Sequence, residues 1–127
     1  VDMPPGTSDV ALTVGQSLPL DGIVMVTSPS KLVSSVVSKA IVMADKMNTK
    51  ILSLVENMAF VKCPNCNEKI YLYKNDVSLD LAKKYNLKLM AALPLDPALA
   101  NMADEGAIED YREDYLNELV ADLLALD

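Results

Sequence analysis

Short apolar runs rich in β-branched residues alternate with helix-like segments along this 127-residue chain. Three runs predict buried strands, because each is short and bounded by turn residues: 23–27, 51–55 and 87–93. Helical periodicity or end signals predict helices over 10–17, 30–47, 76–85, 97–102 and 109–126. This alternation predicts right-handed βαβ units. The expected fold class is therefore α/β, with a mostly parallel sheet between helices on both faces, in three αβα layers.

Two of these helices have a predicted buried face. In the helix that ends at Asn48 and Thr49, the apolar residues at helical spacing are Val33, Val36, Val37, Ala40, Ile41, Ala44 and Met47. In the last helix, the residues expected to point inward are Leu116, Leu119, Val120, Leu123 and Leu124.

The charge of the chain excludes some partners. The formal net charge is -7, so the chain would be repelled by a nucleic-acid backbone and by anionic lipid. Its apolar stretches are far shorter than the ~20 residues that span a bilayer. We therefore expect a cytoplasmic protein with neither nucleic acid nor membrane as a partner.

The informative motifs follow the predicted strands. Parallel sheets bind ligands beyond the carboxyl ends of their strands. The segments expected there are Asp2–Asp9, Thr27–Ser30, Glu56–Cys66 and Pro94–Pro97. These loops are where a ligand site is predicted.

Cys63 and Cys66 are the chain's two cysteines, and there is no histidine. They occupy a turn in a segment, about 60–73, that is expected to form a hairpin arm. Asn67 is suited to a left-handed conformation after that turn. A structural zinc site or a cubane cluster needs four ligands, so two copies of the chain would be required to complete one. A thioredoxin-like redox pair and idle thiols remain alternatives, and the ligands alone do not distinguish zinc from iron–sulfur.

The first residues could form part of a phosphate site. Asp2, at an expected strand end, could hold Mg²⁺, and the Gly6 amide could approach a phosphate closely. An ordinary strand-to-helix turn, with Asp2 solvated and Asp9 as a helix cap, is the alternative. A Gly-rich loop ending in Gly-Lys-Ser/Thr is absent from these residues. ATP hydrolysis by this chain alone is therefore not expected. Because the chain opens on Val1 with almost no preceding strand, we expect further residues upstream.

Four motifs in order resemble the Mrp/ApbC family of iron–sulfur cluster carrier ATPases, in the MinD/ParA group of P-loop proteins. The matching segments are Asp2-Met3-Pro4-Pro5-Gly6-Thr7-Ser8-Asp9, Val26-Thr27-Ser28-Pro29, Val55-Glu56-Asn57-Met58-Ala59 with Cys63-Pro64-Asn65-Cys66, and Leu93-Pro94-Leu95-Asp96-Pro97. The resemblance covers nearly the whole chain. It implies that residues 1–127 are the C-terminal part of one P-loop ATPase domain that lacks its Walker A half.

The resemblance also implies roles for individual residues. Asp2 would hold magnesium, Gly6 would sense the γ-phosphate, and Asp9 would be a catalytic residue that positions water. The adenine would lie near Asn57, Pro94 and Asp96. Cys63 and Cys66 would share a [4Fe–4S] cluster, or zinc as purified, across a homodimer. The cluster would pass to apo-protein acceptors, with ATP and Mg²⁺ acting only alongside the missing half.

The sequence departs from the family pattern around the cysteines. Asn67 replaces the usual Gly, and Tyr71-Leu72-Tyr73-Lys74-Asn75 replaces a Gly-rich stretch. These changes leave both ligands in place but alter the arm. Two other functions fit part of the pattern: a non-enzymatic zinc-knuckle dimerisation module, and a MinD/ParA-like positioning ATPase. The acidic charge counts against the positioning ATPase.

Overall fold

The protein is described by a computed structural model that covers residues 1–4, 6–73 and 76–125. Pro5, Lys74, Asn75, Leu126 and Asp127 lie outside the described residues, and so do the parts of the predicted motifs and last helix that fall on them.

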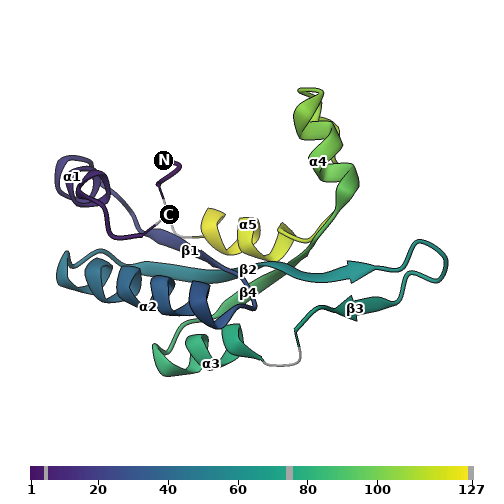
Figure 1. The fold of residues 1–127 in the computed structure, drawn as a ribbon. Helices are drawn as coiled ribbons and strands as arrows, with labels where there is room; N and C mark the ends of the chain where they lie inside the picture. The colour runs from purple at the N-terminus through teal and green to yellow at the C-terminus, as the bar shows by residue number, and fades with distance from the viewer. Residues whose placement is uncertain (5, 74–75, 126–127) are drawn as a thin grey trace.

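A four-stranded, mostly parallel sheet forms the centre of the molecule (Figure 1). Its strands are β1 (Ile23–Thr27), β2 (Ile51–Lys62), β3 (Lys69–Tyr71) and β4 (Leu89–Pro94). β2 pairs in parallel with β1 and with β4, and antiparallel with β3. The expected mostly parallel sheet is confirmed.

Helices cover both faces of the sheet. They are α1 (Asp9–Ser17), α2 (Lys31–Lys46), α3 (Val77–Lys84), α4 (Pro97–Asp104) and α5 (Asn117–Leu124), with a 3₁₀ turn at Ile108–Asp110. In Figure 1, α2 and α3 lie below the sheet and α5 lies above it. This arrangement confirms the three αβα layers predicted from the alternation of elements.

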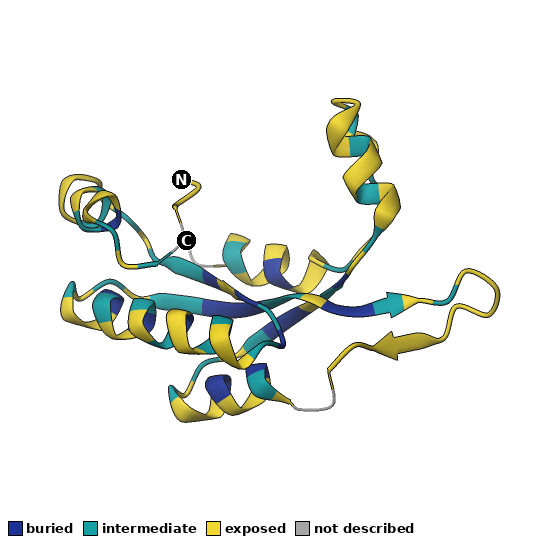
Figure 2. Ribbon diagram, viewed as in Figure 1, coloured by how far each residue is buried: buried dark blue, intermediate teal, exposed yellow. Residues whose placement is uncertain are grey.

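Each face of the sheet has its own apolar core. On the α2 and α3 face, the fully buried Leu54 of β2 packs with residues that include Ile41 and Leu81. On the other face, Leu119 of α5 packs on Val55 and Met90. Buried residues therefore follow β2 and β4 along the middle of the molecule (Figure 2). β2 lies between β1 and β4, and helices cover both faces of the sheet. Its side chains are therefore removed from water on both faces.

The predicted apolar face of α2 is largely correct. Val37, Ile41 and Ala44 are buried, and Val33 packs against them. Val36 is exposed, contrary to the prediction, because its position on the helix turns it away from the sheet.

Helix ends follow the turn chemistry of the sequence. Asn48, Asn86 and Gly106 have positive φ angles of 53°, 52° and 71° just after α2, α3 and α4. After α4, the Ala107 N–H donates to the Met102 carbonyl and the Gly106 N–H donates to the Ala103 carbonyl. This pair of bonds ends a helix on a left-handed residue. The predicted end of a helix at Asn48 is therefore confirmed, and Gly106 ends α4 in the same conformation.

Two predicted segment boundaries are wrong. The segment that follows Val55 is not a loop, because β2 continues to Lys62 through pairing with β3 and β4. The last helix begins at Asn117, not at Glu109, and Tyr111 has an extended backbone. Of the five leucines and valines predicted to point inward, Leu119 is buried and Leu123 packs beside it, whereas Leu116, Val120 and Leu124 are exposed. Tertiary contacts of residues 111–115, described below, override local helix propensity.

Candidate functional site

The two cysteines lie on the turn of a β-hairpin that projects from the sheet, at the end opposite α1 (Figure 1). The hairpin joins the end of β2 to β3, with Phe60, Val61 and Lys62 paired to Tyr71, Ile70 and Lys69. All three β3 residues are exposed, and exposure continues around the turn (Figure 2). We call residues 60–73 the cysteine arm. Its cysteines are therefore open to a second molecule.

Backbone hydrogen bonds shape the turn into a compact loop. The Asn67 N–H donates to the Cys63 carbonyl at 2.9 Å, and the Cys63 N–H donates to the Glu68 carbonyl at 2.9 Å. Asn67 has φ 58°, the left-handed conformation predicted for it. Asparagine tolerates this conformation better than most residues, which explains how the turn closes without glycine.

The turn also favours the thiolate that a soft metal needs. The backbone N–H groups of Asn65 and Cys66 donate to the Cys63 sulfur, and the Cys66 side chain adds to them, so the pKa of the Cys63 thiol is lowered. Both cysteines are free thiols, Cys63 half-buried and Cys66 exposed. Thiolates are the form in which cysteine binds metal. The turn thus presents two soft ligands on one short loop.

One copy of the chain offers an incomplete set of metal ligands. Among the described residues, no group of three or more Cys, Asp or Glu side chains could hold a metal ion. Tetrahedral thiolate sites and cubane clusters need four ligands. Cys63 and Cys66 of one copy would therefore supply at most two of the four ligands, and the sharing of a site between two copies stays a prediction.

The base of the cysteine arm is held by aromatic and charged side chains. The Phe60 ring lies 6.0 Å from the Tyr71 ring and 6.3 Å from the Tyr115 ring. The Lys62 ammonium pairs with the Glu113 carboxylate at 3.1 Å and lies 4.9 Å from the centre of the Tyr115 ring. Sequence reasoning missed this cluster. No sequence signal indicated it, because Tyr111 and Tyr115 stand four residues apart, a spacing typical of one face of a helix.

The three residues predicted to lie near the adenine are at the same end of the sheet as the cysteine arm. Pro94 is buried at the end of β4, opposite Phe60. Asp96 caps α4, where its Oδ1 accepts from the Ala98 N–H at 2.8 Å. Asn57 is half-buried in β2, and its side-chain oxygen accepts from the Met58 N–H at 2.9 Å. The fold thus brings these residues to one edge of the sheet.

Asp96 makes a second contact, to the C-terminal segment. The Tyr111 hydroxyl donates to Asp96 Oδ2 at 2.8 Å. This bond, with the N–H groups of Ala98 and Leu99, lowers the pKa of the Asp96 carboxyl. Burial and the nearby carboxylate raise the pKa of the Tyr111 hydroxyl above its usual range. The ionised form of Asp96 is therefore favoured, and each of its carboxylate oxygens accepts a hydrogen bond.

The predicted magnesium and phosphate residues are not brought to this edge. The segment that carries Asp2, Gly6 and Asp9 lies with α1 beside the start of β1, whereas the cysteine arm lies at the far end (Figure 1). Asp2 is exposed, Asp9 begins α1 and Gly6 has φ 87°. In this arrangement the three residues do not meet Asn57, Pro94 or Asp96.

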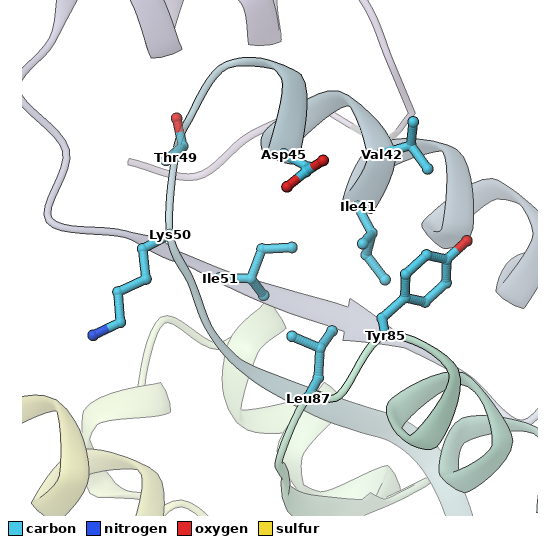
Figure 3. Close-up of a pocket in the computed structure, with 8 residues that line it drawn as sticks. All are labelled: Ile41, Val42, Asp45, Thr49, Lys50, Ile51, Tyr85 and Leu87. Atoms are coloured by element: carbon cyan, nitrogen blue, oxygen red, sulfur yellow. The ribbon is translucent and has the colours of Figure 1, made fainter.

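A cavity of about 400 Å³ lies far from the cysteines, between the end of α2, the start of β2 and the end of α3 (Figure 3). Ile41, Ile51 and Leu87 and the ring of Tyr85 give it apolar walls, and the Lys50 ammonium points away from it. It presents no arrangement for nucleophilic, metal or phosphate chemistry. The cysteine turn therefore remains the candidate site.

No helix in the described part of the chain is long and apolar enough to cross a membrane.

Comparison with known proteins shows the family of the chain. The family described as ParA, NUBPL iron-transfer P-loop NTPase, matches residues 1–125. Two relatives named iron–sulfur cluster carrier protein come from Aquifex aeolicus and Clostridium perfringens. The first is 37% identical over 84% of this chain and 29% of its own length, and the second is 39% identical over 87% of this chain and 39% of its own.

A solved structure has the same fold. It is a nucleotide-binding protein from Archaeoglobus fulgidus in complex with ADP, with cobalt found in it, and it has a TM-score of 0.79 and 41% identity to this chain. The match covers 90% of this chain and 47% of that protein, so the chain spans less than half the length of each of these three proteins. The resemblance to iron–sulfur carriers is thereby confirmed, and the chain belongs to the NUBPL iron-transfer P-loop NTPase family.

Proposed function

We propose that this chain is part of an ATP-dependent iron–sulfur cluster carrier, and that Cys63 and Cys66 of two copies together hold one [4Fe–4S] cluster as cargo. The observation that carries the proposal is the projecting turn that holds two free cysteines, Cys66 exposed and Cys63 half-buried, and backbone N–H groups there lower the pKa of Cys63. Relatives named as carriers of iron–sulfur clusters support the choice of cargo. Apo iron–sulfur proteins would be the acceptors.

An exposed site suits a carrier. A cluster buried within one chain would be slow to leave, whereas a cluster held between two projecting arms can meet an acceptor's thiols. Thiol ligands exchange by direct attack, so access to the cluster sets the rate of transfer. The two chains would each contribute two thiolates, in a symmetric arrangement.

We also propose that ATP and Mg²⁺ regulate the transfer when a P-loop segment is present. Asn57, Pro94 and Asp96 would lie near the adenine, and Asp2, Gly6 and Asp9 would act around the phosphates. Support comes from the sequence motifs and from the ADP complex of the Archaeoglobus fulgidus protein. Because Asp2, Gly6 and Asp9 lie away from the other three residues here, this part of the proposal requires the first segment to occupy another position in the complete site. The cytoplasm is the proposed location.

The test is anaerobic reconstitution of the chain with iron and sulfide, beside a Cys63→Ser, Cys66→Ser variant. We expect a brown protein with about four irons and four sulfides per dimer. The variant should lose the colour, the iron and the sulfide. Addition of an apo-acceptor should then remove the colour from the carrier. A colourless protein that keeps stoichiometric zinc and takes up no sulfide would instead identify a structural zinc knuckle, and it would overturn the proposal.

A further inference from the structure

The segment between the 3₁₀ turn and α5 contacts two other parts of the molecule. One end contacts the β4–α4 loop, and the other end contacts the cysteine arm. At its start, the Tyr111 hydroxyl donates to Asp96, the residue that caps α4. At its end, Tyr115 meets the ring of Phe60 edge-on, at an interplanar angle of 70°. We call residues 111–115 the strap. Its two half-buried residues, Tyr111 and Tyr115, are the ones that touch these two places.

The strap grips the arm immediately before the first cysteine. Lys62 is the last residue of β2 and the neighbour of Cys63. Its ammonium bonds to Glu113 Oε2 at 3.1 Å and lies over the Tyr115 ring. A cation near both a carboxylate and an aromatic face is attracted to each. The direction in which the chain enters the cysteine turn is therefore set by side chains of the strap.

Beyond this base, the arm has little packing of its own. The residues of β3 are exposed, as is the turn apart from the half-buried Cys63, and among the described strands β3 pairs with β2 alone. A two-stranded hairpin is marginally stable unless it packs against something else. The strap supplies that packing at Phe60 and Lys62. Contacts at Phe60 and Lys62, at the base of the cysteine arm, therefore control the position of the cysteine turn at its tip.

We infer that Glu113 and Tyr115 are positioning residues for the cysteine pair: the strap holds the cysteine arm in one orientation and ties that orientation to the β4–α4 loop through Tyr111 and Asp96. The inference rests on the proposed function, since two arms must meet with matched geometry for four thiolates to share one cluster. The strap itself touches neither cysteine and supplies no ligand.

The first test follows hydrogen exchange in the metal-free 127-residue chain. The Leu95 N–H donates to the Phe60 carbonyl at 2.8 Å, so its exchange reports separation of the arm's base from β4. Glu113→Gln removes the ion pair with little change in shape. We expect roughly three-fold faster exchange at Leu95 and through 60–71, the size of effect that a partly exposed pair with an aromatic contact can give.

The chain offers a matched control and a rescue. Lys88, just before β4, forms exposed ion pairs with Glu118 and Asp122 of α5, each at 3.0 Å, and Glu118→Gln removes one of them. Glu118→Gln should leave exchange in the arm unchanged. Reversing the charges, as Lys62→Glu with Glu113→Lys, restores the ion pair but not the contact of a cation with the Tyr115 ring, so exchange should slow again in part, which a general loss of stability would not produce. Equal exchange in the Glu113→Gln and Glu118→Gln variants would overturn the inference.

The second test uses the reconstituted protein and measures the rate at which an iron chelator removes the cluster. Faster removal from Glu113→Gln than from Glu118→Gln, with partial rescue by charge reversal, is the expected result. Faster exchange with an unchanged removal rate would overturn the positioning role. If the unmodified chain takes up no cluster, the proposed function fails. The exchange experiment then decides by itself whether the strap orients the arm.

Discussion

Glu56 of β2 accepts a hydrogen bond from the hydroxyl of Ser78, 22 residues later in the first turn of α3. The two residues lie just before and just after the excursion that carries the cysteines. Ser78 is 1% exposed, and Glu56 is half-buried. The bond therefore fixes the base of the cysteine arm to the sheet on the α3 side, while the strap fixes it on the α5 side.

Ser78→Ala should destabilise the fold. It leaves the Glu56 carboxylate without this donor in a partly buried position, and hydrogen bonds to charged groups contribute about 2 kcal/mol. We expect the free energy of unfolding in urea to fall by about that amount. Ser35→Ala, at an exposed position of α2, is the matched control and should change stability little. Equal stability of the two variants would show that the Glu56–Ser78 bond contributes nothing.

Leu54→Ala should produce the larger loss of stability. Leu54 is 0% exposed and packs at the centre of the core beneath α2 and α3. Truncation of a buried leucine leaves a cavity and typically costs about 3 kcal/mol. Leu32→Ala, at a residue 76% exposed, is the control. Urea unfolding checks both, and a loss below that of Ser78→Ala would contradict the assignment of this core.

The cysteine turn should accept glycine but not valine at position 67. Asn67 has φ 58°, which glycine adopts freely, whereas a β-branched residue there costs about 1–2 kcal/mol or more. With Zn²⁺ as the probe, Asn67→Gly should bind as the unmodified chain does. Asn67→Val should bind roughly ten-fold more weakly. Competition with a chromophoric chelator measures both, and tight binding by the valine variant would mean that the metal-bound turn does not need this backbone.

Tyr111→Phe should change how stability depends on acid. The pKa of Asp96 is lowered mainly by the Tyr111 hydroxyl, so the stability that this carboxylate contributes is complete above its ordinary pKa of 3.8 and is lost as the pH falls through the lower folded value. Removing the hydroxyl raises the folded pKa of Asp96 toward 3.8. The acid-dependent part of the unfolding free energy should therefore shrink.

Urea unfolding between neutral and acidic pH, with a carboxyl-carbon NMR titration of Asp96, measures this effect. Tyr73→Phe, at an exposed tyrosine of the arm, is the control and should follow the unmodified chain. An unchanged Asp96 titration in Tyr111→Phe would show that the 2.8 Å contact does not shift its pKa.

Short-range signals predicted much of the fold. β1 occupies the predicted residues, and α2 ends at Lys46, just before the left-handed Asn48 predicted to stop it. Such features depend on side-chain size, β-branching and turn chemistry within a few residues, which are readable in order along a chain. The candidate thiolate pair was predicted for the same reason, since Cys63 and Cys66 are neighbours in sequence.

Contacts between segments that are distant in the sequence could be found only in the tertiary structure. The acidic residues near Glu113 suit the first turn of a helix, yet Glu113 pairs with Lys62 and residues 111–116 are not helical, because contacts 51 residues apart outweigh a weak helix preference. The continuation of β2 past Glu56 likewise depends on pairing with β3 and β4. The sequence by itself determined the layers and singled out the two cysteines as candidate ligands. The packed structure decided how the cysteine arm is held, because long-range contacts form only once the chain has folded.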